Sequence, residues 1–479
     1  MNRFSLKESC AAVKLELNKN ELETIREAVI SQLIKIPQIP KSKPGLLYIL
    51  WLVASVIAFL FIIITYLGII GGGVFFIYWH SSRFNEIVND KFSFVVFFSL
   101  PLILVIGFLL IIIKPIFNRR KSDIFIEKVT PEDEPFIYAF ANEIARITSA
   151  PKPKEICITS DVNAFASFRK GFWSIFFPGC DMQLSLGLPL INGLTMPELA
   201  GVIAHEFGHF SQGSGMKVSY LLRRFNFWLA RIVYERDKWD YYVHKENWVI
   251  FQPGIWLGRQ IIWLLMMLGN AVAAHLLRQM EYDADKNEIS LSGTDCFLKT
   301  NEKFNRLGFS GNISVSIALV LLKDEGRLAD NWGEFVVNNL DELVDEKIKE
   351  DIQKFENSET SFWDSHPSFK DRNKAALELN QEGYFNYSMH PLFQSKVDEL
   401  KQKHEYTFLS FNNILLTDME KTSKRITTQL YEFNLGKEFS KDALVPVEEI
   451  IRSKRNYLST LKASKRFLMV FYQIHSILI

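Results

Sequence analysis

Charged side chains are absent from two long stretches of this 479-residue chain. No Asp, Glu, Lys or Arg occurs in the 39 residues 44–82 or in the 22 residues 92–113. Over the whole chain, 55 basic residues nearly balance 54 acidic ones. This balance argues against a nucleic-acid-binding protein, for which a basic surface is expected. Because the chain is 48% apolar and 14% aromatic, it is not largely disordered either.

Cysteine is scarce as well. The four cysteines are widely spaced and form no Cys-x-x-Cys pair: Cys10, Cys157, Cys180 and Cys296. Dense disulfide frameworks are typical of small secreted proteins, so this pattern favours a reducing compartment. It also lends no support to a metal or redox site built from cysteine.

The two uncharged stretches predict membrane-spanning helices. As a helix, residues 92–113 would extend about 33 Å at ~1.5 Å per residue, close to the ~30 Å hydrocarbon core of a bilayer. In the longer stretch we expect a span over residues 46–70, a break at the glycines 71–73, and the aromatic residues 75–79 at an interface. A pair of buried core helices is the alternative, and the lack of charge over such lengths argues against it.

The flanking charges predict the orientation of these spans. Basic residues precede the first span and follow the second: Lys35, Lys41, Lys43, Lys114, Arg119, Arg120 and Lys121. By the positive-inside rule, the N-terminus and everything after residue 114 are expected in the cytoplasm. No cleavable signal peptide is expected, since a charged segment precedes the first apolar run.

The remaining pattern predicts a mixture of helices and a few strands. A helix is expected around residues 21–36, and strands at residues 155–159 and 181–189, the second with alternating apolar residues. Thr195 and Glu198 form a capping-box pattern that opens a helix, with Pro197 tolerated in its first turn. From about residue 290 the chain has the pattern of charged amphipathic helices.

A metal-binding motif lies on the helix that Thr195 opens: His205-Glu206-Phe207-Gly208-His209. Two histidines four residues apart on a helix project from one face, close enough to bind one ion. Glu206 stands beside them, where it can accept a proton from an attacking water. Imidazole ligands with a neighbouring base favour Zn2+ as the cofactor. Two core histidines without a ligand are the alternative, which the uncharged residues before the motif and the helix cap make less attractive.

A catalytic zinc needs a third protein ligand and one open position. The metzincin extension is excluded because it requires Gly and His where this chain has Gln212 and Gly215. A carboxylate from a second helix is the other solution. Glu281 and Asp285 are four residues apart and share a helix face, so one can bind zinc while the other orients a ligand histidine. A solvated surface pair is the alternative interpretation.

Taken in order, these motifs resemble those of a gluzincin-type family of membrane metallopeptidases that includes HtpX and the CAAX prenyl proteases. The resemblance covers roughly residues 45–375 and rests on the two early spans and four motifs: Asn163-Ala-Phe-Ala, the HExxH helix, Glu281-Tyr-x-Ala-Asp285, and Ser365-His366-Pro367 followed by Arg372. Glu288 departs from the family, which usually has a small apolar residue there, and residues 376–479 match nothing in it.

The resemblance implies roles for the outlying residues. Glu281 would be the third zinc ligand and Asp285 the carboxylate behind a ligand histidine. Asn163 and His366 would lie near the scissile carbonyl and stabilise the oxyanion, and Arg372 would support the site. From the residues alone, Asn163 could be a turn residue and His366 a loop residue. His275, in an apolar run, is expected to be a core or interhelical histidine and not a ligand.

The predicted activity is zinc-dependent hydrolysis of peptide bonds with Glu206 as the general base. An extended substrate is expected to pair with the alternating strand, which gives affinity with little sequence selectivity; the residues concerned are Gln183, Leu184, Ser185, Leu186 and Gly187. Unfolded or membrane-near proteins are the expected substrates. A specific processing protease for a lipidated or peptide substrate is one alternative, and a catalytically idle, zinc-stabilised membrane scaffold is another.

The ligands constrain the topology. Glu281 must meet the two histidines, so the chain between them crosses the membrane an even number of times or not at all. Residues 260–277 are uncharged and long enough for one crossing, whereas residues 220–234 carry three arginines, which are costly at the bilayer centre. We expect the apolar hairpin 216–280 to pack on the catalytic domain or dip into the membrane surface. Two crossings overall are favoured, and four are the alternative.

The expected protein is therefore helix-dominated α+β. A cytoplasmic helix and Pro-rich linker (1–45) precede two transmembrane helices (46–114), a gluzincin-like peptidase domain with a small sheet (115–375) and a helical C-terminal region (376–479). We expect an integral protein of the bacterial inner membrane with its catalytic domain in the cytoplasm. Its partners would be the lipid bilayer and a protein or peptide substrate.

Overall fold

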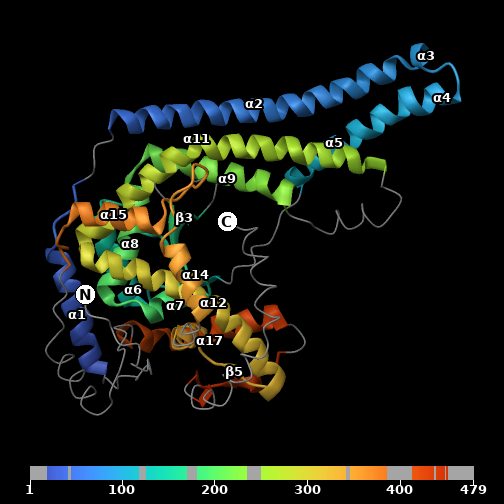
Figure 1. Ribbon diagram of the computed structural model, residues 1–479. Coiled ribbons are helices and arrows are strands. Elements are labelled where there is room, and N and C mark those ends of the chain that lie inside the picture. Colours follow the sequence, from blue (N-terminus) through green and yellow to red (C-terminus); the bar gives the residue numbers. More distant parts are fainter. Residues whose placement is uncertain are drawn as a thin grey trace.

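The computed structural model describes residues 19–40, 45–117, 126–169, 181–234, 250–340, 346–385, 413–435, 439–447 and 449–450. Figure 1 shows a bundle of long helices beside a mixed domain of helices and strands. Helices dominate and the strands are few and short, so the expected α+β class is confirmed.

The two uncharged stretches form long helices that lie side by side. α2 spans Leu46–Ser82, and the chain returns through a π-helical turn at Phe94–Ser99 into α5 (Leu100–Phe117). The break expected at residues 71–73 is wrong, because α2 continues through all three glycines. In a bilayer the backbone N–H and C=O groups must be bonded within the helix, which opposes a break there.

The predicted hairpin forms two further helices of the bundle. α9 (Ser214–Tyr234) runs parallel to α2, since Phe59 contacts Phe225 and Tyr66 contacts Trp228 further along both helices. The bundle core combines buried residues of all four helices, among them Tyr66, Ile112, Leu229 and Ile262.

α11 (Gln252–Ser292) runs in the direction opposite to α2. Trp51, near the start of α2, stacks on His275 with ring centroids 4.5 Å apart, whereas Ile62, further along α2, packs at Gly269. His275 is therefore an interhelical histidine, as expected. By length and composition, four described helices could cross a membrane: α2, residues 91–113, α11 and α12 (Thr294–Glu325).

The main sheet of the mixed domain has four strands in the order β1-β2-β4-β3. These are β1 (Ile126–Val129), β2 (Glu155–Thr159), β3 (Ala164–Phe168) and β4 (Met182–Gly187). β4 pairs parallel to β2 on one side and antiparallel to β3 on the other. The expected pairing of a substrate with residues 183–187 is therefore wrong, since both edges of β4 are already occupied. β1 and β3 are the two edge strands, and β3 is the one next to β4.

α8 (Met196–Ser211) is the central helix of this domain and packs against β3, α6 (Pro135–Ile147), α11 and α12. It begins as predicted, because the backbone N–H of Thr195 donates to the Glu198 carboxylate at 2.7 Å. Lys303 of α12 also donates to Glu198, at 2.8 Å, and fixes the start of α8.

The C-terminal helices complete the domain. α13 (Trp332–Asn338) is joined to α17 (Asn413–Leu435), because the Trp332 backbone N–H donates to Thr427 Oγ1 at 2.9 Å. The Trp332 indole donates to the Ser160 carbonyl at 3.0 Å, beyond the end of β2. The other described elements are α1 (Lys19–Lys35), α3 (Phe84–Ile87), α4 (Lys91–Ser93), α7 (Leu188–Gly193), α14 (Glu346–Glu356), α15 (Phe369–Leu379), a 3-10 turn (Lys441–Ala443), and the strand pair β5 (Leu328–Ala329) and β6 (Leu444–Val445).

Candidate metal centre

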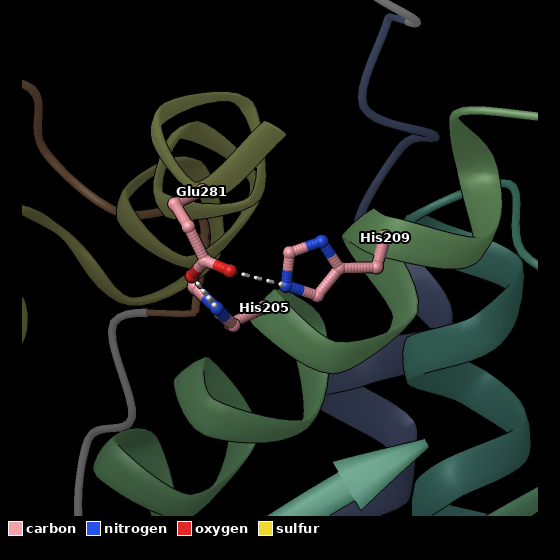
Figure 2. A group of neighbouring side chains, drawn as sticks. All are labelled: His205, His209 and Glu281. Atoms are coloured by element: carbon pink, nitrogen blue, oxygen red, sulfur yellow. Dashed lines mark ion pairs between the residues drawn. The ribbon is translucent and has the colours of Figure 1, made fainter. Parts of the chain in front are cut away.

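Two helices bring three potential metal ligands together. α8 presents His205 and His209, and α11 presents Glu281 toward both rings (Figure 2). His205 Nε2 lies 3.4 Å from one carboxylate oxygen of Glu281, and His209 Nε2 lies 3.7 Å from the other. One ligand atom from each residue lies within 4.8 Å of the others, and all three residues are buried.

Glycines on α8 allow this close approach of the two helices. A Cβ added at Gly208 would lie 3.1 Å from Ala284 Cα, which belongs to the backbone of α11. One added at Gly201 would lie 3.1 Å from Glu288 Cγ. A side chain at position 208 would therefore crowd α11, and a large one would push Glu281 away from the histidines.

The three side chains fit a zinc ion. Two imidazole nitrogens and one carboxylate are the ligand set of a common class of catalytic zinc site. Burial lowers the pKa of His209 to about 3, which keeps the ring in the neutral form that binds metals. Among the described residues, the other group that could hold an ion is His205 with Asp285 and Glu288, and it shares His205 with the first.

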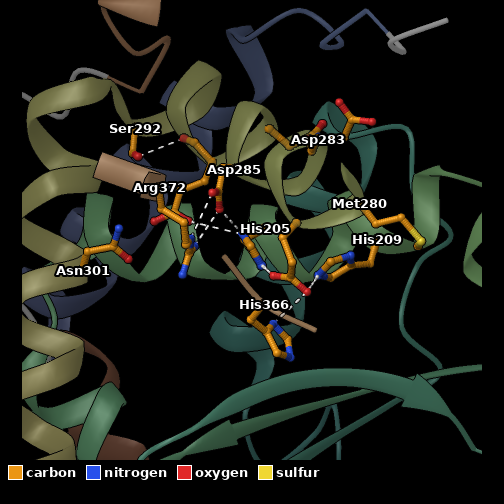
Figure 3. Close-up of polar contacts among 12 residues, drawn as sticks. His205, His209, Met280, Asp283, Asp285, Ser292, Asn301, His366 and Arg372 are labelled. Atoms are coloured by element: carbon orange, nitrogen blue, oxygen red, sulfur yellow. Dashed lines mark hydrogen bonds and ion pairs between the residues drawn. The ribbon is translucent and has the colours of Figure 1, made fainter. Parts of the chain in front are cut away.

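Asp285 lies behind the His205 ring. Its Oδ1 is 3.0 Å from His205 Nδ1, the nitrogen turned away from the Glu281 carboxylate. Arg372 of α15 in turn donates to both oxygens of Asp285, at 3.0 and 2.6 Å (Figure 3). Glu288 reaches the same nitrogen of His205 at 3.6 Å. Its other oxygen is buried and has no hydrogen-bond partner among the described residues.

Glu206 lies between the metal ligands and the sheet. Its Oε2 accepts a hydrogen bond from the backbone N–H of Ala166 at 3.1 Å, so the carboxylate touches the edge strand β3. Desolvation by the surrounding protein raises the pKa of Glu206. A carboxylate with a raised pKa is better matched to accept a proton near neutral pH.

His366 joins the cluster from the loop before α15. Its Nδ1 is 3.1 Å from Glu281 Oε1, and its side chain is 59% exposed, so it lies at the mouth of the site. Asn163 is exposed and lies just before β3. Its side-chain oxygen accepts from the neighbouring Ala164 N–H at 2.9 Å, and its carbonyl accepts from Gly187 N–H at 2.8 Å.

Arg223 of α9 is a site residue that the motifs did not identify. Its Nη2 donates to Glu281 Oε1 at 3.1 Å, the oxygen that also faces His366. The available signal was the presence of arginine on an otherwise apolar helix, since a charge in such a segment often marks a functional site.

Comparison with known protein families finds a match over most of the peptidase domain. Residues 131–380 match the sequence profile described as peptidase family M48. No curated protein matches the chain. Among solved structures, the chain is similar to a crystal structure of S. mikatae Ste24p at 16% identity, over 68% of this chain and 67% of that chain, with a TM-score of 0.24.

Proposed function

The chain belongs to peptidase family M48, and we propose that it is a membrane-anchored, zinc-dependent endopeptidase acting on unfolded or membrane-near proteins. One observation supports this most: the Glu206 carboxylate lies beside His205 and His209 and touches the backbone of a sheet edge. An idle scaffold would have no need of a base at that point.

Zinc held by His205, His209 and Glu281 would polarise the scissile carbonyl and acidify the attacking water. Glu206 takes the proton of that water and passes it to the leaving amine. Arg223 and His366 both approach Glu281 Oε1, so they converge on one side of the site. There they can donate to the oxygen on which negative charge develops.

The substrate would pair with β3. In this edge strand the N–H of Ala166 points to Glu206 and not to the partner strand β4. An extended substrate added to the same edge would place its backbone next to Glu206. Main-chain pairing of this kind gives affinity without a strict sequence requirement, which suits unfolded proteins.

Four membrane crossings are favoured by the bundle, in place of the two favoured by the sequence. α9 is about 31 Å long at ~1.5 Å per residue, enough to cross a hydrocarbon core by length, although its arginines leave it outside the described helices that are apolar enough to cross by composition. Two of these arginines have partners within the protein, since Arg223 donates to Glu281 and Arg224 to the Tyr220 hydroxyl, which lowers their cost. α9 runs in the same direction as α2, and α11 runs in the opposite direction. Glu281, near the end of α11, therefore lies on the same side of the membrane as the two histidines. α12 packs on α7, α8 and α13 of the peptidase domain, and we do not count it as a crossing.

The site would lie level with the membrane surface. His275 stacks on Trp51, one to two turns inside α2. Glu281 is six residues further along α11, about 9 Å at ~1.5 Å per residue and toward the start of α2. Glu281 is thus level with the point where the uncharged stretch begins. The basic flanks favour a cytoplasmic position for that end of the bundle, and we propose the inner membrane of a bacterium as the location.

Substrate class is tested with the reconstituted protein. Wild type and Glu206→Gln are incubated in proteoliposomes with unfolded casein, a folded protein and a prenylated peptide. We expect wild type to cut casein at internal sites and Glu206→Gln to cut nothing. Exclusive cleavage of the prenylated peptide would favour a processing protease, and no cleavage of any substrate by wild type would contradict the proposal.

A further inference from the structure

An exposed aromatic pair lies on the loop that carries His366. Phe362 and Trp363 pack edge to face with ring centroids 5.1 Å apart, and they are 55% and 50% exposed. Leaving two adjacent aromatic side chains exposed to water to this extent costs free energy, which burial in an apolar environment would recover. We propose that this loop contacts the bilayer, with Phe362 and Trp363 inserted at the boundary between headgroups and acyl chains.

The depth of the pair supports a lipid contact. The Phe362 ring lies 6.0 Å from the His275 ring, and His275 stacks on Trp51 of α2. Trp51 is five residues inside the uncharged helix, about 7.5 Å at ~1.5 Å per residue. Aromatic side chains are enriched at this level of membrane proteins. Two ring contacts thus link Phe362 to Trp51 on α2, and Leu50 and Val53 of the same helix are exposed.

Hydrogen bonds hold the backbone of the loop beneath its exposed aromatic pair, which is flanked by the exposed residues Ser361 and Asp364. Arg278 of α11 donates to the carbonyls of Ser361, Phe362 and Asp364, the last at 2.8 Å. The Asp364 carboxylate accepts from the Ser361 N–H at 2.7 Å, so this acidic group is used within the turn. An interfacial loop needs such internal bonds, because water is scarce at that depth.

This contact would couple the bilayer to the site. His366 follows two residues after Asp364 and reaches Glu281, and Arg278 precedes Glu281 by one helical turn. Membrane insertion of the tip would thus hold His366 at the mouth of the site. The inference goes beyond the proposed function, since it concerns a lipid contact and does not require hydrolysis.

Bound lipid can be distinguished from bound substrate by fluorescence. Wild type and Trp363→Phe are reconstituted into vesicles with ordinary or brominated acyl chains, and the difference between their emission spectra isolates Trp363. Trp332→Phe is the matched control, because Trp332 is buried in the peptidase domain. The set is repeated in the Glu206→Gln background, so that the result is independent of catalysis.

We expect brominated lipid to remove most of the Trp363 emission and to leave the Trp332 emission unchanged, in both backgrounds. Equal emission of Trp363 in the two kinds of vesicle would overturn the proposal. So would quenching of Trp363 by a brominated peptide substrate in place of lipid, because the aromatic pair would then be a substrate subsite. Absence of peptidase activity in the wild-type vesicles, with normal lipid quenching of Trp363, would contradict the proposed function alone.

Discussion

Asp285 Oδ1 lies 3.0 Å from Nδ1 of His205, on the side of the ring opposite the nitrogen that faces Glu281. A carboxylate in this position can accept the Nδ1–H, which leaves the Nε2 lone pair free for a metal and fixes the ring. Arg372 holds both oxygens of the same carboxylate. The three residues form a chain from α15 through α11 to α8.

Replacing the carboxylate behind His205 should weaken metal binding. We expect Asp285→Asn to lower zinc affinity by about 10–100-fold, the usual effect of removing such a partner. Competition with a chromophoric chelator measures the change. Asp283→Asn is the matched control, because Asp283 is on the same helix and pairs with Lys286 at 2.8 Å. Equal affinities of the two variants would contradict this role for Asp285.

Removing the guanidinium behind Asp285 should destabilise the domain. In Arg372→Met the buried Asp285 carboxylate loses its cation, and loss of one partner of a buried pair costs about 3–5 kcal/mol. A lowered thermal midpoint in detergent would report this loss. Lys370→Met is the control on the same helix, since Lys370 pairs with the exposed Glu359. If both variants melt alike, the pair at Asp285 is no more than a surface contact.

Widening the gap between α8 and α11 should abolish metal binding without touching a ligand. Gly208→Val would force a side chain against the backbone of α11 at Ala284 and move Glu281 away from the histidines. Gly308→Ala on α12 meets nothing within 4 Å and should be neutral or stabilising. Metal content after dialysis measures both. A Gly208→Val protein with full zinc occupancy would show that the helices need not approach closely.

The edge of β3 can be tested by removing one backbone donor. Ala166→Pro deletes the N–H that reaches Glu206 and leaves the pairing of β4 with β2 intact. We expect KM for an extended peptide to rise while metal content stays the same, because proline blocks strand addition at that edge. Ser167→Ala should change neither. An unchanged KM in Ala166→Pro would remove β3 from substrate binding.

The local parts of the site could be predicted from the sequence because they depend on short-range geometry. Two histidines at helical spacing share a face wherever the helix lies, and the Thr195–Glu198 cap fixes where that helix begins. The uncharged stretches could also be predicted as helices, since a segment that crosses a bilayer must bond all of its backbone N–H and C=O groups internally.

Contacts between distant segments could not be predicted in the same way. The alternating pattern of β4 gives one buried face but not its neighbours, and the pairing with β2 and β3 makes it a central strand. Arg223 and Glu281 are 58 residues apart in the sequence. Their pairing depends on how α9 packs against α11, which the sequence pattern of either helix does not specify. The break predicted at residues 71–73 rests on the low helix propensity of glycine in water, which does not decide the backbone of an apolar helix in a bilayer.

The central claim is that Glu206 is the base beside a zinc held by His205, His209 and Glu281. The most direct measurement is zinc content and casein hydrolysis in the same proteoliposome preparations of wild type, Glu206→Gln and His209→Ala. We predict one zinc per chain in wild type and in Glu206→Gln, loss of zinc in His209→Ala, and hydrolysis by wild type alone. Full hydrolysis by Glu206→Gln, or full zinc occupancy in His209→Ala, would contradict the claim.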